Sequence, residues 1–206
     1  MQYQHHGLTI KAGDQLINTP WLNSNDSRMI PAAYQALYAD YALTPELSFI
    51  AFRQTAFQSR TSDSYSGLNL YNVNDQIFGG TPLTNLGNTT DIGTLAAGST
   101  FQNENINGEI WGYQFYDFAK LIYGNFIYSF TNPTLLTPLL GIQIAHETGD
   151  GSDLLEQTGY GFVDNNIFGA MIGVNIPQGG ITIGYNNIPK ENGAFHNGDV
   201  VSPIPP

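Results

Sequence analysis

The chain has 206 residues, contains no cysteine and has a formal net charge of −11, although only 11% of its residues are charged. The acidic balance argues against nucleic-acid binding, which needs Lys and Arg, and the absence of thiols excludes disulfides and thiolate metal sites. With 23 Gly, 12 Tyr and 12 Phe, the composition favours short strands joined by turns over helices, and neither a transmembrane helix nor a signal peptide is recognisable.

Apolar and polar residues alternate along much of the chain with the period of a β-strand. In the segment 139–147, for example, Leu140, Ile142 and Ile144 alternate with small or polar residues such as Gln143. We expect about seven strands, in chain order at 8–13, 33–43, 46–60, 109–130, 139–147, 166–176 and 181–185. The third of these alternates poorly, and the fourth is expected to be one long strand with a bend near 116–120.

The segments between these strands are short and long in alternation. Short turns are expected at 44–46, 131–138 and 177–180, and longer polar loops at 18–31, 61–108, 148–166 and from 189 onward. A hairpin within 109–130 would break this alternation, which is why we prefer a single bent strand there. Short turns at one end and long loops at the other are typical of outer-membrane β-barrels. The sequence therefore predicts one all-β domain, residues 1–206, built as an antiparallel transmembrane β-barrel meander.

In such a barrel the apolar set faces lipid, and the polar set faces a water-filled lumen. On the convex, outer side we therefore expect Ile142, Ile144, Phe168, Ile172 and Val174. On the concave, inner side we expect Asn125, Gln143, Asn175 and Thr182. The alternative is a soluble β-sandwich, in which the apolar set would be buried in a closed core.

Several segments, in their order and spacing, resemble the OprD-type outer-membrane porins of Gram-negative bacteria. Gly13-Asp14-Gln15, Pro20 and the segment 26–31 (Asp-Ser-Arg-Met-Ile-Pro) resemble a strand end and the loop after it. The stretches IWGYQFYDFAKLIYGNF, ETGDGSDL and GFVDNNIFGAMIGV resemble a Trp- and Tyr-rich strand, a Gly-Asp-Gly loop and a later Asp-Asn strand of that family. The resemblance covers most of 8–188. Because family members are longer, complete barrels with a signal peptide, we expect this chain to be a fragment of a porin that lacks both ends.

The resemblance implies that the loop 18–31 folds into the barrel and narrows the pore. Arg28 would then present a permanently charged guanidinium to the lumen, able to hold a carboxylate bidentately. Asp26 would lie beside it and offer the opposite charge. The alternative is that Asp26 and Arg28 form a local salt bridge that only shapes the loop.

Three further cations are candidates for a basic track along the lumen, such as the resembled family uses. Lys11 alternates with Leu8 and Ile10 and should point inward. Arg53 and Arg60 lie along the third strand, and we expect Arg53 inside because a lipid-facing Arg near the midplane would cost about 2–4 kcal/mol. Ordinary solvated wall charges are the alternative interpretation.

No other pattern indicates chemistry. The adjacent His5 and His6 should point to opposite sides of a strand and make a poor metal pair, and the acidic segment 149–153 lacks the ligand pattern of a calcium loop. We expect no enzyme activity, cofactor or metal. The predicted function is passive diffusion of small hydrophilic solutes, including carboxylate-bearing ones, across the bacterial outer membrane. The expected partners are these solutes, outer-membrane lipid and, for the full-length protein, two further copies in a homotrimer. The alternative from another class is a soluble or secreted β-rich binding module, for carbohydrate for example, with Trp21 and Trp111 as stacking platforms.

Overall fold

The computed structural model describes residues 1–24, 31–58, 63–65, 93–131, 136–157, 159 and 161–194. Within these ranges the chain forms ten strands and one short helix. Their bounds are β1 (Gln2–His5), β2 (Leu8–Gln15), β3 (Ala33–Ala42), β4 (Leu47–Gln58), β5 (Thr94–Gln102), β6 (Ile106–Phe115), β7 (Ala119–Ser129), β8 (Thr137–Gly149), α1 (Leu154–Gln157), β9 (Asp164–Ile176) and β10 (Gly179–Asn187).

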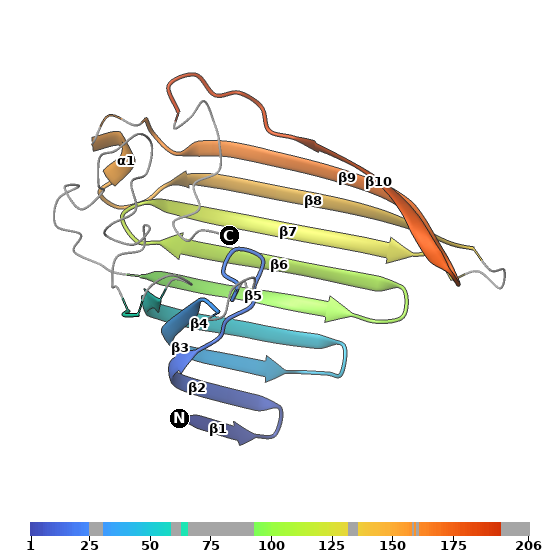
Figure 1. Ribbon diagram of the computed structural model, residues 1–206, viewed down its shortest axis with the longest axis horizontal. Helices are drawn as coiled ribbons and strands as arrows, with labels where there is room; N and C mark the ends of the chain where they lie inside the picture. The colour runs from blue at the N-terminus through green and yellow to red at the C-terminus, as the bar shows by residue number, and fades with distance from the viewer. Residues whose placement is uncertain are drawn as a thin grey trace.

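The ten strands form a single sheet in which each strand pairs with its neighbour in the sequence (Figure 1). Every pairing is antiparallel. The predicted all-β antiparallel meander is therefore confirmed. Among the described residues, no helix is long and apolar enough to cross a membrane.

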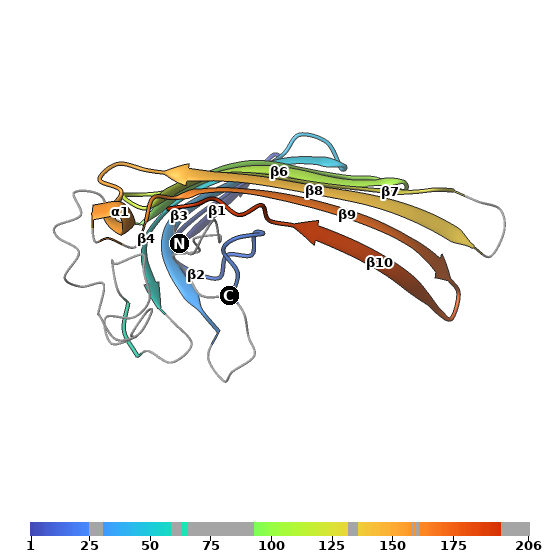
Figure 2. The ribbon, with the colours of Figure 1, turned by 90° about the horizontal axis from the view of Figure 1, so that it is seen from above.

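The sheet is arched, and the loop that follows β2 lies on its concave side (Figure 2). We call the concave side the inner face and the convex side the outer face. β1 and β10 are the two edges, and in the described part of the chain they do not pair with each other. The sheet is thus an open section of a barrel wall.

The strand count differs from the sequence prediction in three places. β1 lies in a stretch for which no strand was expected, β5 lies inside the expected long loop 61–108, and the expected single strand 109–130 is split into β6 and β7. The bent-strand prediction and the C-terminal part of the loop prediction are therefore wrong. The two errors cancel in their effect on strand direction. β5 adds one strand to the predicted number, and the division of 109–130 into β6 and β7 adds a second. The remaining strands consequently keep their predicted directions.

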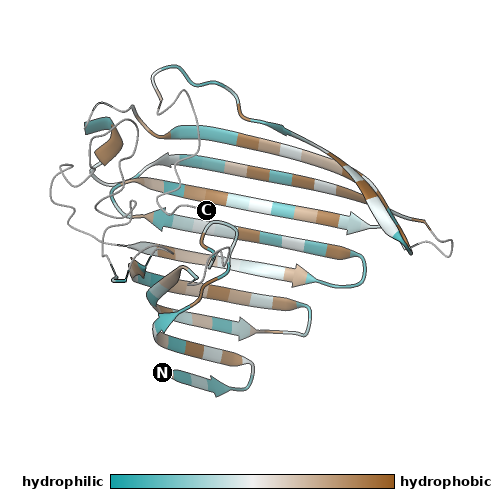
Figure 3. Cartoon of the chain, in the orientation of Figure 1, coloured by the Kyte–Doolittle hydropathy of each residue, from teal (hydrophilic) through white to brown (hydrophobic). Residues whose placement is uncertain are grey.

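The two faces carry the side chains that the alternation predicted. Along β8, Ile142 and Ile144 are 53% and 55% exposed, whereas Ala145 and Glu147, on the other side of the strand, are buried. Hydrophobic and hydrophilic residues alternate in the same way along neighbouring strands (Figure 3). A soluble sandwich would bury the outer apolar set in a closed core. The structure leaves Ile142, Ile144, Phe168 and Ile172 of this set exposed, so their predicted position on the outer face is confirmed.

The hydrophobic core lies on the inner face, towards the end of the sheet where the long loops are. It is formed by Trp111, Tyr113 and Phe115 of β6 together with residues of the loop after β2 and of α1. Buried side chains from outside the strands include Ile17 and Leu22 of the loop after β2 and Leu154 and Leu155 of α1. The concave side of the wall is therefore partly filled by the loop that was expected to narrow the pore.

Candidate pore-constriction site

The loop after β2 is held by a tight turn of its own. The Thr19 N–H donates to the Leu22 carbonyl at 2.6 Å, and the Leu22 N–H donates to Thr19 Oγ1 at 3.3 Å. The Asn18 side chain accepts from the N–H and the hydroxyl of Ser24 at 3.0 and 2.8 Å. Ile17 and Leu22 are completely buried against the wall. These contacts fix the described part of the loop, residues 16–24, to the inner face.

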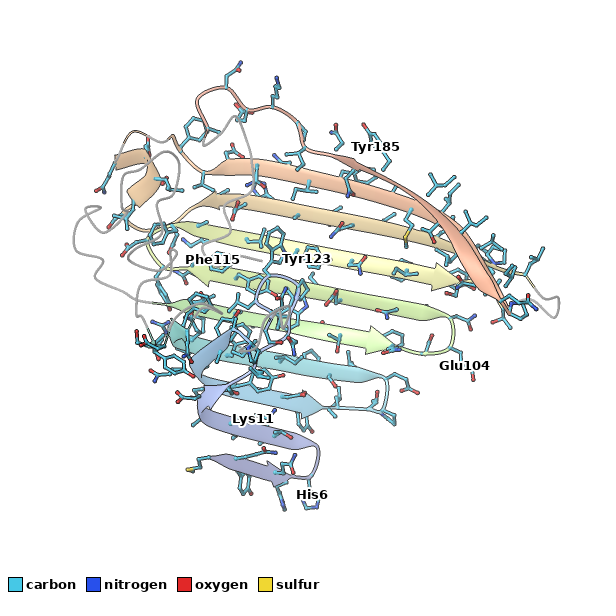
Figure 4. All side chains as sticks on the ribbon, viewed as in Figure 1. His6, Lys11, Glu104, Phe115, Tyr123 and Tyr185 are labelled. Atoms are coloured by element: carbon cyan, nitrogen blue, oxygen red, sulfur yellow. The ribbon has the colours of Figure 1, made fainter. Side chains whose placement is uncertain are left out.

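An aromatic ladder on β6 receives this loop. Trp111, Tyr113 and Phe115 are successive inner-face residues, and their rings stack at centroid distances of 5.7 and 5.8 Å. Trp21 from the loop meets Tyr123 of β7 edge to face at 6.2 Å, and Tyr123 lies beside the loop (Figure 4). Aromatic pairs of this kind add stability beyond the area that they bury. The loop thus packs against the aromatic ladder, which is not an open surface.

Between the loop and the wall a hollow of about 410 Å³ remains. The loop lines it with Asn18, Thr19 and Pro20, and the wall lines it with Ile50, Thr100, Glu109, Trp111 and Tyr123. The Glu109 carboxylate accepts a hydrogen bond from Trp111 Nε1 at 2.9 Å. The hollow therefore has one carboxylate, held by the aromatic ladder, at its wall.

Glu109 belongs to a polar row that crosses the inner face. Thr100 pairs with Glu109, Glu109 with Asn125, Asn125 with Gln143, and Gly169 connects Gln143 with Asn186. Gln143 Nε2 donates to the Tyr123 hydroxyl at 3.0 Å. Hydroxyl, amide and carboxylate groups on a concave wall are suited to contact water or a hydrophilic solute.

Comparison with known proteins gives a family match over most of the chain. The model described as "outer membrane porin, OprD family" matches residues 4–198. The chain belongs to the OprD family. Members of this family are outer-membrane porins, which places the chain in the bacterial outer membrane. A comparison with curated protein sequences found no match.

Solved OprD-family structures share the fold. Pseudomonas aeruginosa OpdK, determined with vanillate, superposes with a TM-score of 0.73 at 17% identity, covering 91% of this chain and 46% of OpdK. P. aeruginosa OccK8 (OprE) gives 0.75 at 15% identity over 91% and 49% of the two chains. Acinetobacter baumannii OccAB3 gives 0.72 at 17% identity over 91% and 43%. The chain thus spans about half the length of the structures that it matches.

The cations expected for the basic track of this OprD-family wall do not all lie on the inner face. Lys11 pairs with Tyr38, which pairs with the buried inner-face residue Phe52, so Lys11 is on the inner face (Figure 4). Its Nζ lies 5.5 Å from the Tyr38 ring centroid. This placement agrees with the expectation for Lys11, although its part in selecting solutes stays a prediction.

Arg53 is on the other side of the sheet, so the prediction that it points inward is wrong. It pairs with Leu37 and Leu95, which are exposed apolar residues of the outer face. Its guanidinium lies 4.4 Å from the ring centroid of Tyr116, in the β6–β7 turn, and donates to the Gln54 carbonyl at 2.6 Å. A long side chain can carry its charge along an apolar surface towards a polar end. The cost assumed for an Arg in the middle of the lipid band therefore does not apply.

Asp26, Arg28 and Arg60 lie outside the described residues, so their roles remain predictions. The prediction for His5 and His6 is wrong in its geometry. His6 adopts a φ of +42° in the turn, and the two rings contact each other, with Nε2 of His5 and Nδ1 of His6 in a hydrogen bond. In the described ranges no three His, Asp or Glu side chains are arranged to hold a metal ion.

Glu109 was not among the predicted site residues, and Trp111 was predicted as a binding residue only under the soluble alternative. The available signal was the segment Glu109-Ile110-Trp111-Gly112-Tyr113. In that segment a carboxylate shares one side of a strand with two aromatic residues. In the structure this side of the strand faces the loop after β2.

Proposed function

We propose that the chain forms part of the wall of a water-filled outer-membrane pore through which small hydrophilic solutes diffuse passively, with no catalytic step. The observation that carries this proposal is that the sheet has an apolar outer face and a partly polar inner face. The outer face exposes Ile142 and Ile144, as suits lipid, while the inner face carries the polar row and a loop fixed across the wall. A channel narrowed by an inward loop selects solutes by size and charge.

For selectivity, we propose that Arg28, with Asp26 beside it, and Lys11 attract carboxylate-bearing solutes. The inner-face position of Lys11 supports this part. OpdK, which shares the fold, was solved with vanillate, itself a carboxylate. A fixed cation in a narrowed passage attracts anionic groups more strongly than one in bulk water.

Arg28→Ala tests this proposal. In the porin isolated from outer membranes and reconstituted in planar bilayers, we expect the anion-to-cation permeability ratio to fall by about half, because one fixed charge leaves the constriction. The measurement is the reversal potential under a KCl gradient. Arg53→Gln is the matched control, since it removes one arginine charge from the outer face. An equal effect of both variants, or none, would assign Arg28 to shaping its loop only.

The homotrimer expected for the full-length protein stays a proposal. Sedimentation of the detergent-solubilised porin tests it, since a trimer and a monomer differ threefold in protein mass. A single species at monomer mass would contradict it.

A further inference from the structure

The outer face carries a shallow groove near the end of the sheet where the long loops are. The groove has a volume of about 280 Å³ and lies over β7, β8, β9 and the end of β10. Ile122, Ile144 and Phe168 line it and are 60%, 55% and 49% exposed. In an outer-membrane barrel this face contacts lipid, so an acyl chain has direct access to an apolar groove.

A pair of polar side chains lies at the end of the groove nearest the long loops. His146 of β8 and Asn166 of β9 line this end and are register partners. Both residues are exposed, and Nδ1 of His146 lies 2.9 Å from Oδ1 of Asn166. Since a carboxamide oxygen only accepts, Nδ1 of His146 donates this hydrogen bond. The groove therefore passes, towards the long loops, from aliphatic and aromatic side chains to groups that can hydrogen-bond a lipid headgroup.

A lysine lies further towards the long loops on the same face. Lys120 is two residues from Ile122 on β7, so the two share a face about 7 Å apart along the strand. The Nζ of Lys120 pairs with Oδ1 of Asp150 at 2.7 Å, but the lysine side chain is 56% exposed and the aspartate side chain only 5%. The surface thus presents the ammonium rather than the carboxylate. Because an ammonium has three N–H donors, Lys120 can bind a phosphate oxygen and keep its bond to Asp150.

Arg53 lies in the same row of the outer face as Lys120. Two residues, Leu95 and Gln114, connect them through the strand register, and three strand spacings correspond to about 14 Å. The acidic residue of this row, Asp164, lies two spacings beyond Lys120, on the side away from Arg53. Two of the four Lys and Arg residues in the described ranges are thus at one level of the outer face. Cations at the edge of a lipid-facing surface attract anionic headgroups.

We propose that this part of the outer face binds a lipid of the outer leaflet that combines acyl chains with a phosphate-bearing headgroup. One acyl chain lies in the groove, the headgroup contacts His146 and Asn166, and a phosphate pairs with Lys120. The wall is apolar towards its middle and cationic towards the long loops, which is the order of the groups within such a lipid. Long loops of outer-membrane barrels are extracellular, which assigns the site to the outer leaflet. The inference concerns the face opposite the lumen and does not depend on the pore function.

Native mass spectrometry of the detergent-folded porin tests the site. The probe is lipid A, an acylated disaccharide with two phosphates, and the comparison is phosphatidylcholine, whose phosphate is compensated by its own ammonium. We expect wild type to bind its first lipid A molecule at a lower concentration than phosphatidylcholine. In Lys120→Gln the half-saturating concentration of lipid A should rise about fivefold, the upper end for one exposed ion pair.

Lys11→Gln is the matched control for the charge, since it removes one lysine from the inner face, and it should bind lipid A like wild type. Lys120→Arg keeps the charge and should also match wild type. Equal binding of the two lipids by wild type, or an equal effect of Lys120→Gln and Lys11→Gln, would overturn the proposal. The heat-modifiable shift on gel electrophoresis reports whether each variant is folded.

The competing explanation is that lipid A coats the whole outer face without a defined site. Ile144→Ala and Ile142→Ala separate the two explanations, because both residues are on the outer side of β8 with nearly equal exposure, 55% and 53%, and Ile144 lines the groove whereas Ile142 does not. We expect the half-saturating concentration of lipid A to rise about threefold in Ile144→Ala, from the lost apolar contact, and to stay at the wild-type value in Ile142→Ala. Equal effects would refute the groove. This pair leaves Lys120 intact, so it decides even if Lys120→Gln does not fold.

Discussion

At the scale of single residues, the position of Trp111 depends on the residue opposite it being a glycine. Trp111 pairs with Gly98 of β5, and a Cβ built on Gly98 would lie 2.4 Å from Trp111 Cδ2 and 2.7 Å from the Ile110 carbonyl. The indole thus lies flat on the backbone of β5. This close approach is what brings the indole N–H to Glu109 and the ring to the edge of the hollow.

Gly98→Val should therefore displace Trp111 and disturb the packing of the loop after β2 against the wall. We expect a loss of unfolding free energy of about 1–3 kcal/mol, as for overpacked core positions, and a shift of the tryptophan emission. Urea unfolding of the detergent-folded porin, followed by fluorescence, measures both. Gly112→Val is the matched control, because a Cβ on Gly112 meets no heavy atom within 4 Å. Equal losses in the two variants would mean that valine acts through the strand backbone rather than through Trp111.

At the scale of elements, the β6–β7 hairpin is joined to the loop after β8. Asp117 in the hairpin turn has a φ of +65°, accepts the Ser152 N–H at Oδ1 at 3.1 Å, and its carbonyl accepts the Leu154 N–H at 3.0 Å. Asp150, in the loop after β8, forms an ion pair with Lys120 and accepts hydrogen bonds from the side-chain amide of Gln114. The hairpin turn thus supports α1, whose leucines belong to the same hydrophobic core as the aromatic ladder.

Asp117→Ala should loosen α1 without changing the strands. The substitution removes the bond to Ser152 and places a Cβ residue without a local hydrogen bond at positive φ, which together cost about 1–3 kcal/mol. Faster amide hydrogen exchange is expected in 150–157, with β7 and β8 unchanged. Asp117→Asn keeps the acceptor oxygen and tolerates positive φ, so it should behave like wild type. Slow exchange in 150–157 of the alanine variant would show that α1 is held by its leucines alone.

Which strands could be predicted from the sequence depended on the size of their alternating side chains. β8 and β9 were predictable because large apolar residues alternate along them. β5 reads Thr-Leu-Ala-Ala-Gly-Ser-Thr-Phe-Gln, whose small residues carry almost no alternation, since the indole of Trp111 takes the space of an inner side chain. The β6–β7 turn was missed because it reads Tyr116-Asp117-Phe118, in which Asp117 is the single residue that favours a turn and neither glycine nor proline is present.

At the scale of the whole molecule, alternation predicted the faces but not what covers the inner one. The rule of apolar outside and polar inside holds for Gln143 and Ile144, yet it fails on β6, where Ile110 is exposed and Trp111 is buried on the opposite face. Both sides of β6 are apolar there because one faces outward and the other faces the loop. The contact between Trp21 of the loop and Tyr123 of β7 joins residues 102 positions apart in the sequence, which no local pattern encodes.

The assignment of the faces has a direct test. Ile144→Lys should hinder folding into lipid vesicles and cost about 2–4 kcal/mol, because it places a charge on the lipid-facing side of the wall. Asn125→Lys, on the inner face near the same level, should cost much less. Folding is followed by the heat-modifiable shift on gel electrophoresis in vesicles of phosphatidylcholine. Similar losses in both variants would contradict the lipid-facing assignment of Ile144.

The two sheet edges set a rule of parity for any complete pore. β1 runs towards the end with the short turns. Each strand is antiparallel to the one before it, so the tenth strand, β10, runs in the opposite direction to β1. Their backbone N–H and C=O groups need partners within the lipid. Strands that complete the ring between these edges must therefore be even in number, whichever polypeptide supplies them. A completing segment would consequently enter and leave the bilayer on the same side, so insertion and closure need no net translocation of its ends.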